Sequence, residues 1–337
     1  MSKLLHSTFF FLVLLMACSP TAHYSGNANN VANHHTASTQ EVQPVTISHF
    51  DTVGAGETDS FAGKKPLSLM DLPQTEDGKI VLSEGFYETE FKSYCLQPGT
   101  PSPSDRDAYL QAPLTGYRKD IIETILRNSL KRPDLEQRNI QLLLWSVVSG
   151  SDFRKNSWEV QSTAEQLLSS KQIFELKGGV VGVVKTVSAA LPETGVNSAN
   201  YKLKQLFELG TNSYDAYERI AVLQQPSELH KVQAKKDQWY KQQEGFYLRY
   251  FPSGYQQVKV QVFVPAGTLD TSSAQRKYLL FDPVTVMAVP ASSNAQRLGI
   301  GAPVSNIIRK IIQIQQVPPT PKKLPVKTNN PKQVVSK

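Results

Sequence analysis

The clearest pattern of hydrophobic and polar positions in the first third of the chain is an alternation over residues 79–96, KIVLSEGFYETEFKSYCL. One face carries Tyr87, Thr89, Phe91, Ser93 and Cys95, and the other carries Glu88, Glu90 and Lys92. A period of two is typical of a half-buried strand, because successive side chains of a strand point to opposite faces. The pattern therefore predicts a strand that ends near Cys95, with this cysteine pointing inward beside Phe91.

Two helices are predicted after a loop rich in Pro, Gly and Ser. The first covers residues 118–130 and ends before Pro133, and the second runs from 133 to 150. The apolar positions of the second helix share one face, and they are Ile140, Leu143, Leu144, Trp145, Val147 and Val148. Gln141 falls on the same face. A buried amide without hydrogen-bond partners costs about 1–3 kcal/mol, so Gln141 needs partners.

The second half of the chain predicts helices and then strands. Amphipathic patterns favour helices over 201–209 and 214–223, and a capping serine, Ser227, begins a polar helix. Residues 246–265 predict a β-hairpin that turns at 252–254, with the alternating valines Val258, Val260, Val262 and Val264 pointing inward. Residues 277–291 predict another strand or pair of strands, and 306–315 a closing helix or strand.

These elements indicate an α+β fold, with a helical body and an antiparallel sheet or a small β-sandwich. We expect a signal peptide at 1–17, a flexible tether at 18–44, a first folded region at 45–160 and a second at 161–316 that packs with it. Residues 317–337 contain five prolines and five lysines and predict a disordered tail. The tether and the tail therefore flank the folded body on both sides.

Composition and charge exclude one class of partner. The 337 residues are 40% hydrophobic, enough for one large or two modest domains with real cores. The formal net charge is +7, but the leader holds one lysine and the tail after residue 316 holds five lysines and no acidic residue. The folded body is then close to neutral, so we expect no nucleic-acid partner. Contact of the basic tail with peptidoglycan or anionic lipid, and a solvated tail without a partner, both remain open.

The N-terminal segment carries an export signal. An apolar run from Phe9 to Met16 follows Lys3 and is too short to span a membrane. The run ends in Leu15-Met16-Ala17-Cys18, which resembles the lipobox of bacterial lipoproteins. The resemblance implies that Cys18 becomes an acylated N-terminus, with palmitate among its acyl chains, and anchors the protein in a membrane. Ser19 follows the cysteine, which by the same resemblance favours the outer membrane, with the body in the periplasm or at the cell surface.

A second resemblance covers residues 94–148. Tyr94-Cys95-Leu96, a Pro/Gly-rich loop, and then the helices that contain Gln141 and Leu144-Trp145 resemble the TQXA-type thioester domain of bacterial surface adhesins. In that family a cysteine and a glutamine condense with loss of ammonia, which here implies a thioester between Cys95 and Gln141. Tyr94, Leu144 and Trp145 would line its pocket. Ile140 stands where the family has threonine.

The thioester hypothesis has one implication for geometry and one for function. The second helix must pack across the end of the strand, so that the side chains of Cys95 and Gln141 are in contact, with Sγ and Cδ within about 4 Å of each other. A buried thioester is shielded from water and acylates an incoming amine, for example on a partner protein or surface. The implied function is attachment or adhesion.

Two alternatives remain open. In the first, Cys95 is an inert core cysteine, and the chain is a non-catalytic structural lipoprotein of an envelope or secretion assembly that binds protein partners. In the second, the chain is an enzyme, but a Cys/His hydrolase needs a histidine, and residues 45–316 offer only His49 and His230. No phosphate-binding glycine loop, zinc spacing or paired carboxylate motif is present. We therefore expect no catalytic turnover, no cofactor and no metal.

Overall fold

The structure, a computed structural model, describes residues 65–116, 118–178, 195–229, 237, 239–269 and 278–305. The predicted signal peptide with Cys18, the tether, the closing element at 306–315 and the tail lie outside these residues. The polar helix predicted over 227–243 is wrong in its described parts, because Leu229 forms an isolated β-bridge with Ser293 and Tyr240–Lys241 form a short strand.

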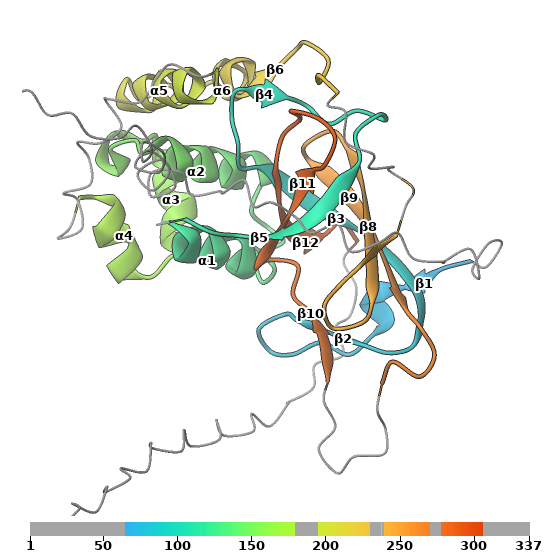
Figure 1. The fold of residues 1–337 in the computed structure, drawn as a ribbon. Coiled ribbons are helices and arrows are strands. Elements are labelled where there is room, and N and C mark those ends of the chain that lie inside the picture. The colour runs from blue at the N-terminus through green and yellow to red at the C-terminus, as the bar shows by residue number, and fades with distance from the viewer. Residues whose placement is uncertain are drawn as a thin grey trace, which may run out of the picture.

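Six antiparallel strands form a closed barrel (Figure 1). In ring order they are β3 (Gly85–Cys95), β12 (Leu298–Pro303), β11 (Val286–Pro290), β5 (Tyr109–Pro113), β8 (Tyr247–Ser253) and β9 (Gln257–Val264). The ring closes because β9 pairs with both β8 and β3. A closed barrel has no free sheet edges among its strands. The prediction of helices with an antiparallel sheet is confirmed, and the alternative of a small β-sandwich is wrong.

Short strands flank the barrel. β1 (Leu67–Ser68) runs parallel to β3, and β7 (Tyr240–Lys241) pairs with β8. Two further pairs are β2 (Ile80–Leu82) with β10 (Leu279–Phe281), and β4 (Thr100–Pro101) with β6 (Val222–Leu223). Strands from both predicted regions, 45–160 and 161–316, thus share one barrel.

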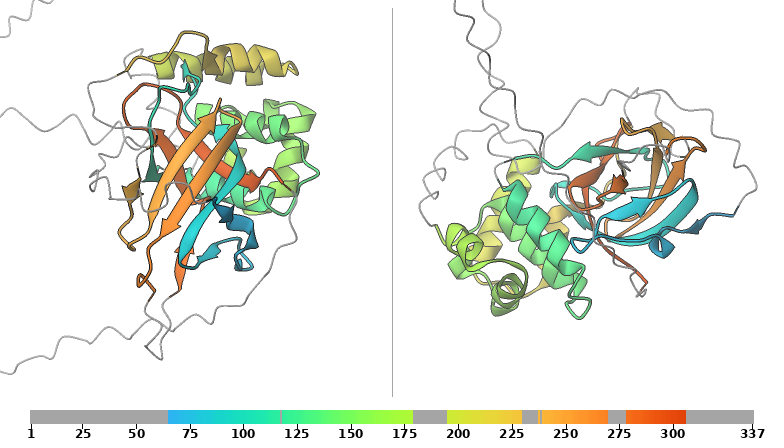
Figure 2. Two further views of the ribbon diagram at one scale, coloured as in Figure 1. Left: turned by 90° about the vertical axis from the view of Figure 1, so that its right-hand side faces the viewer. Right: turned by 90° about the horizontal axis from the view of Figure 1, so that it is seen from below.

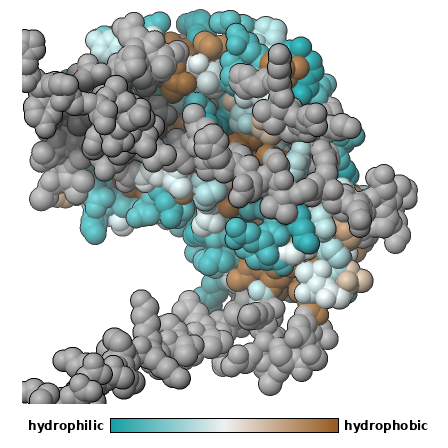
Figure 3. Space-filling model, viewed as in Figure 1, coloured by the Kyte–Doolittle hydropathy of each residue, from teal (hydrophilic) through white to brown (hydrophobic). Residues whose placement is uncertain are grey.

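The helices gather on one side of the barrel, which the view from below shows end-on (Figure 2). They are α1 (Lys119–Ser129), α2 (Gln137–Ser149), α3 (Trp158–Leu167), α4 (Ser170–Leu176), α5 (Gly195–Glu208) and α6 (Tyr214–Ala221), with 3-10 turns at Leu69–Asp71 and Phe153–Lys155. α1 packs on β12, and α2 contacts β3 as well as α1, α3, α5 and α6. On the face shown in Figure 3, hydrophilic residues cover most of the coloured surface and hydrophobic ones form small, separate patches.

Glycines on β12 allow β3 and α1 to approach closely. A Cβ atom on Gly301 would lie 2.7 Å from Cε2 of Tyr94 and 3.5 Å from Oγ of Ser129. One on Gly299 would lie 3.0 Å from Cδ1 of Leu96. The side chains of Tyr94 and Leu96 therefore fill the space that side chains on β12 would otherwise occupy. Both lie on the α1 side of β3, and Cys95, between them in sequence, points to the opposite face.

Most predicted elements are confirmed, with shifted ends. The alternating segment forms β2 and β3, and Cys95 is the last residue of β3. α1 and α2 fall within the two predicted helices, and α2 ends at Gly150, whose φ of 67° is the left-handed cap that glycine adopts easily. The four alternating valines of the hairpin are all buried.

Two expectations about the elements were wrong or incomplete. The hairpin was predicted to turn at 252–254, but Pro252 and Ser253 pair with Val258 and Gln257, so the strands continue further. Gly254, with a φ of 65°, begins the turn instead. The pattern also gave no prediction for α3, which packs on α1 and α2, or for α4, which contacts α3.

Candidate functional site

The site lies at the end of β3, beyond the last residue of β3 that pairs with β9. The two strands pair as far as Lys92 and Gln257, and the N–H of Ser93 donates the last bond to the carbonyl of Gln256 at 2.9 Å. Beyond this point the hairpin turns away. On this edge, the main-chain groups of Cys95 would be left unpaired inside the protein, at a cost of about 1–3 kcal/mol for each group.

Helix α2 supplies the missing hydrogen bonds. Oε1 of Gln141 accepts from the N–H of Cys95 at 2.8 Å, and its Nε2 donates to the carbonyl of Cys95 at 3.0 Å. Gln137, one helical turn earlier, donates from Nε2 to the carbonyl of Ser93 at 3.1 Å. Residues four apart share one face of a helix, so α2 lays a row of two amides along the open edge of β3.

The thiol of Cys95 is enclosed and free of any disulfide. The residue is 0% exposed, and Gln141 is 1% exposed. Burial raises the pKa of the Cys95 thiol to about 12, against the opposing effects of the Trp145 side chain and the N–H of Gln97. The thiol is therefore protonated at neutral pH. Nε1 of Trp145 is buried without a conventional hydrogen-bond partner among the described residues, and the group beside its ring is this thiol.

Aromatic rings cover the thiol from the outside. The ring of Trp145 stacks on Tyr214 of α6, with centroids 5.7 Å apart and an interplanar angle of 30°. It also lies 6.3 Å from the ring of Tyr255, in the turn between β8 and β9. Trp145 and Tyr255 are buried, whereas Tyr214 is half-buried. The cover thus reaches the surface at Tyr214.

The structure brings some of the predicted site residues together and separates others. Cys95, Gln141 and Trp145 form one cluster, as the packing of α2 across the strand end requires. Tyr94 lies on the other face of β3, against Ser129 and Gly301. Leu144 is buried in the core at 0% exposure.

Three residues of the cluster escaped the sequence reasoning. The spacing of Gln137 from Gln141 is itself a signal, because four residues place two side chains on one helix face. Tyr214 and Tyr255 carry no such signal, since they reach the site from segments far away in sequence.

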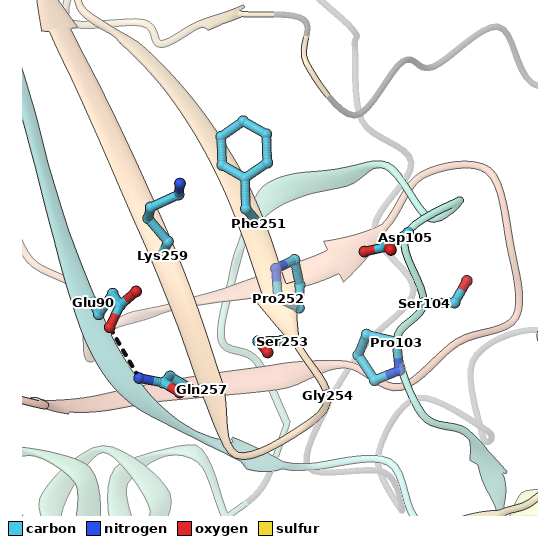
Figure 4. Close-up of a pocket in the computed structure, with 10 residues that line it drawn as sticks. All are labelled: Glu90, Pro103, Ser104, Asp105, Phe251, Pro252, Ser253, Gly254, Gln257 and Lys259. Carbon is cyan, nitrogen blue, oxygen red and sulfur yellow. Dashed lines mark hydrogen bonds between the residues drawn. The ribbon is translucent and has the colours of Figure 1, made fainter. Parts of the chain in front are cut away.

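A separate groove of about 520 Å³ lies between the tip of the β8–β9 hairpin and the loop at 103–105 (Figure 4). Two pairs of its lining residues interact: Nε2 of Gln257 donates to Oε2 of Glu90 at 3.1 Å, and Nζ of Lys259 lies 5.3 Å from the ring of Phe251. The lining holds no cysteine or histidine, and the hydroxyl of Ser104 donates to Oδ2 of Asp107 at 2.7 Å. Within the described ranges, no group of three or more His, Cys, Asp or Glu side chains could hold a metal ion.

No family model, curated protein or solved structure matches this chain. Among the helices of the described residues, none combines the length and the apolar character needed to cross a membrane.

Proposed function

We propose that this chain is a lipid-anchored envelope protein that attaches covalently to an amine-bearing partner through a thioester between Cys95 and Gln141. The observation that carries the proposal is the contact between the Gln141 amide and the main chain of Cys95. Both residues are almost fully enclosed. A thioester between their side chains would account both for a lone inward thiol and for a glutamine on an apolar helix face.

The hydrogen bonds of Gln141 suit the bond-forming step. Attack of Sγ on Cδ places negative charge on Oε1, which already accepts from the N–H of Cys95 at 2.8 Å. A donor in place before the charge develops stabilises such a transition state. The Sγ–Cδ bond forms, the Cδ–Nε2 bond breaks, and the thiol proton leaves with the amide nitrogen as ammonia.

In the attachment step, an amine opens the thioester. An amine attacks Cδ, an amide bond to the partner forms, the Sγ–Cδ bond breaks, and Cys95 regains its proton. Because water reaches an enclosed thioester poorly, hydrolysis competes weakly with this reaction. A lysine side chain of a partner protein, or an amine on a surface, has the required chemistry.

Mass spectrometry of the purified full chain tests the proposal. We expect the wild-type protein to be about 17 Da lighter than the mass calculated for its sequence together with any attached acyl chains, as loss of ammonia requires. Treatment with methylamine should then leave the label on Gln141 and free the Cys95 thiol. Cys95→Ala should abolish both signals, and Gln137→Ala, which leaves the reacting pair intact, should keep them. A wild-type mass without the deficit would contradict the thioester.

One observation favours the alternative of a non-catalytic structural lipoprotein of an envelope or secretion assembly that binds protein partners. Gln141 makes two hydrogen bonds to the main chain of Cys95, and Gln137 makes a similar bond to Ser93. A pair of amides that only completes a strand edge would produce this geometry without any reaction. The same mass measurement separates the two functions, since the structural role leaves Gln141 and Cys95 unmodified.

A further inference from the structure

A chain of hydroxyl groups lies over the aromatic cover of Cys95. The hydroxyls of Tyr214 and Tyr255 are 2.8 Å apart, and the Tyr255 hydroxyl donates to Oε1 of Glu218. Nε2 of Gln256 donates to the Tyr255 oxygen at 3.1 Å. Tyr214 and Glu218 come from α6, and Tyr255 and Gln256 come from the β8–β9 turn, so the network joins two elements above the site.

The hydrogen bonds give this network a direction. A tyrosine hydroxyl has one proton to donate. Tyr255 uses its proton toward Glu218, so in its bond with Tyr214 it can only accept. Tyr214 therefore donates to Tyr255, and the Tyr214 oxygen keeps lone pairs that can accept a proton. The network has an accepting end at Tyr214 and a carboxylate at its other end.

The accepting end of the network belongs to a residue that packs on the cover of the thiol. Tyr214 stacks on Trp145, which lies against the Cys95 thiol. Burial raises the pKa of Tyr214 to about 12, with further increases from the charges of Glu218 and Cys95 and opposing hydrogen bonds to Tyr255 and Gln256. The hydroxyl thus keeps its proton at neutral pH. As the half-buried member of the cover, Tyr214 stands between solvent and the reacting pair.

We propose that Tyr214, Tyr255 and Glu218 form a proton relay that serves a primary amine as it attacks the thioester. The inference rests on the proposed function and adds its acid–base partner. Tyr214 is the group that meets the amine, and Tyr255 and Glu218 act through it as positioning residues. The substrate class that needs such a relay is a neutral primary amine, because it must lose a proton once its nitrogen bonds to Cδ of Gln141.

The proton balance closes within the site. The amine nitrogen gives a proton to Tyr214, Tyr214 passes its own proton to Tyr255, and Tyr255 passes its proton to Glu218. The Sγ–Cδ bond breaks, and the thiolate of Cys95 recovers a proton through the same relay. The net reaction is thioester plus amine to amide plus thiol, without any further reactant.

Glu218→Gln tests the relay by comparing two nucleophiles on the purified full chain. Methylamine must lose a proton as it reacts, whereas mercaptoethanol attacks as a thiolate and has none to lose. We expect the variant to carry the same mass deficit as wild type and to react with methylamine about a hundredfold more slowly, the usual contribution of acid–base catalysis. Its exchange with mercaptoethanol should be unchanged, because Cys95 leaves as a thiolate and takes up its proton only after the Sγ–Cδ bond has broken. Asp215→Asn, which removes an exposed carboxylate from the same helix, is the matched control and should change neither rate.

Tyr214→Phe provides a second variant, because it removes the accepting oxygen and keeps the ring that stacks on Trp145. It should show the same selective loss of methylamine reactivity. A methylamine rate in Glu218→Gln equal to that of wild type would overturn the relay, and so would an equal fall for both nucleophiles, which indicates a structural effect. A wild-type protein without the mass deficit would instead overturn the proposed function, and this result is read before any nucleophile is added.

Discussion

Gln141 shows how one side chain can serve as a substitute for a strand. Its amide presents a donor and an acceptor in the arrangement that a neighbouring peptide group would offer to Cys95. On the other edge of β3, the N–H of Leu96 donates to the carbonyl of Arg297 at 2.9 Å, so β12 serves that side. The end of β3 is thus held by a strand on one edge and by a helix on the other. The position of the thiol depends on both.

Gln141→Met tests this role apart from any chemistry, since methionine has a similar shape but offers no amide. The N–H and carbonyl of Cys95 would then be buried without partners, at about 1–3 kcal/mol each. We expect the free energy of unfolding, measured by urea denaturation with tryptophan fluorescence, to fall by about 2–6 kcal/mol. Gln137→Met is the control and should cost less, because Gln137 is only half-buried and water can replace its bonds. Equal losses would show that the two amides are equivalent.

The strands and helices differ in how far the sequence predicts them. β3, α1 and α2 each carry a period that local sequence displays, and all three were predicted. The closure of the barrel was not, because β3 pairs with β12 from the far end of the described chain and no local pattern specifies that partner. The same reason explains which site residues were predicted. Gln141 was predicted because a polar residue stands out on an apolar helix face, whereas Tyr214 and Tyr255 come together only in the folded chain.

Asp107 joins three segments that border the barrel. Its Oδ2 accepts from the N–H and the hydroxyl of Ser104, both at 2.7 Å, and its Oδ1 accepts from the hydroxyl of Ser227 at 2.7 Å. Burial alone would raise the pKa of Asp107, but the hydrogen bonds from Ser293, Ser227 and Ser104 outweigh it and leave the pKa below its ordinary value. The charged form is therefore the one that the fold favours.

This shift gives a pH dependence of defined sign. Because the pKa of Asp107 is lower in the folded state, its contribution to stability is fully present above the unfolded pKa of about 3.9 and is lost as pH falls through the folded value. We expect Asp107→Asn to lower the free energy of unfolding at pH 7 by about 1–3 kcal/mol, since its NH₂ group would face donors. Urea denaturation from pH 7 to 3 should show a shallower loss in the variant than in wild type. Parallel curves would assign the acid sensitivity to other groups.

Taken as a whole, the folded body and the chain ends have different tasks in the proposed function. The described residues contain the site, and they include no helix able to span a membrane. In the proposal, Cys18, which lies outside the described residues, links the chain to the membrane, and Gln141, activated by its thioester to Cys95, links it to a partner. The chain would thus carry two different covalent links, a cysteine bonded to lipid and a former glutamine amide bonded to an amine.

Cys18→Ala tests the lipid link. We expect the variant to leave the membrane fraction and appear in the soluble fraction, because each buried methylene of an acyl chain contributes about 0.8 kcal/mol to membrane binding and all of them are lost. Fractionation with high-salt washing and immunoblotting measures this change. Cys95→Ala is the control and should stay with the membranes. A Cys18→Ala protein that remains wholly membrane-bound would contradict the lipid anchor.

The pairing of β3 with β12 also sets an order of assembly. Cys95 lies directly opposite Leu298, near the end of the described chain. During synthesis, the end of β3 therefore lacks its neighbour β12 until almost all of the described chain has been made. Contacts between such distant segments form slowly. Throughout this interval the strand end that carries Cys95 is not fixed on its β12 edge, so its thiol is less well shielded from oxidants and from other thiols than in the finished fold.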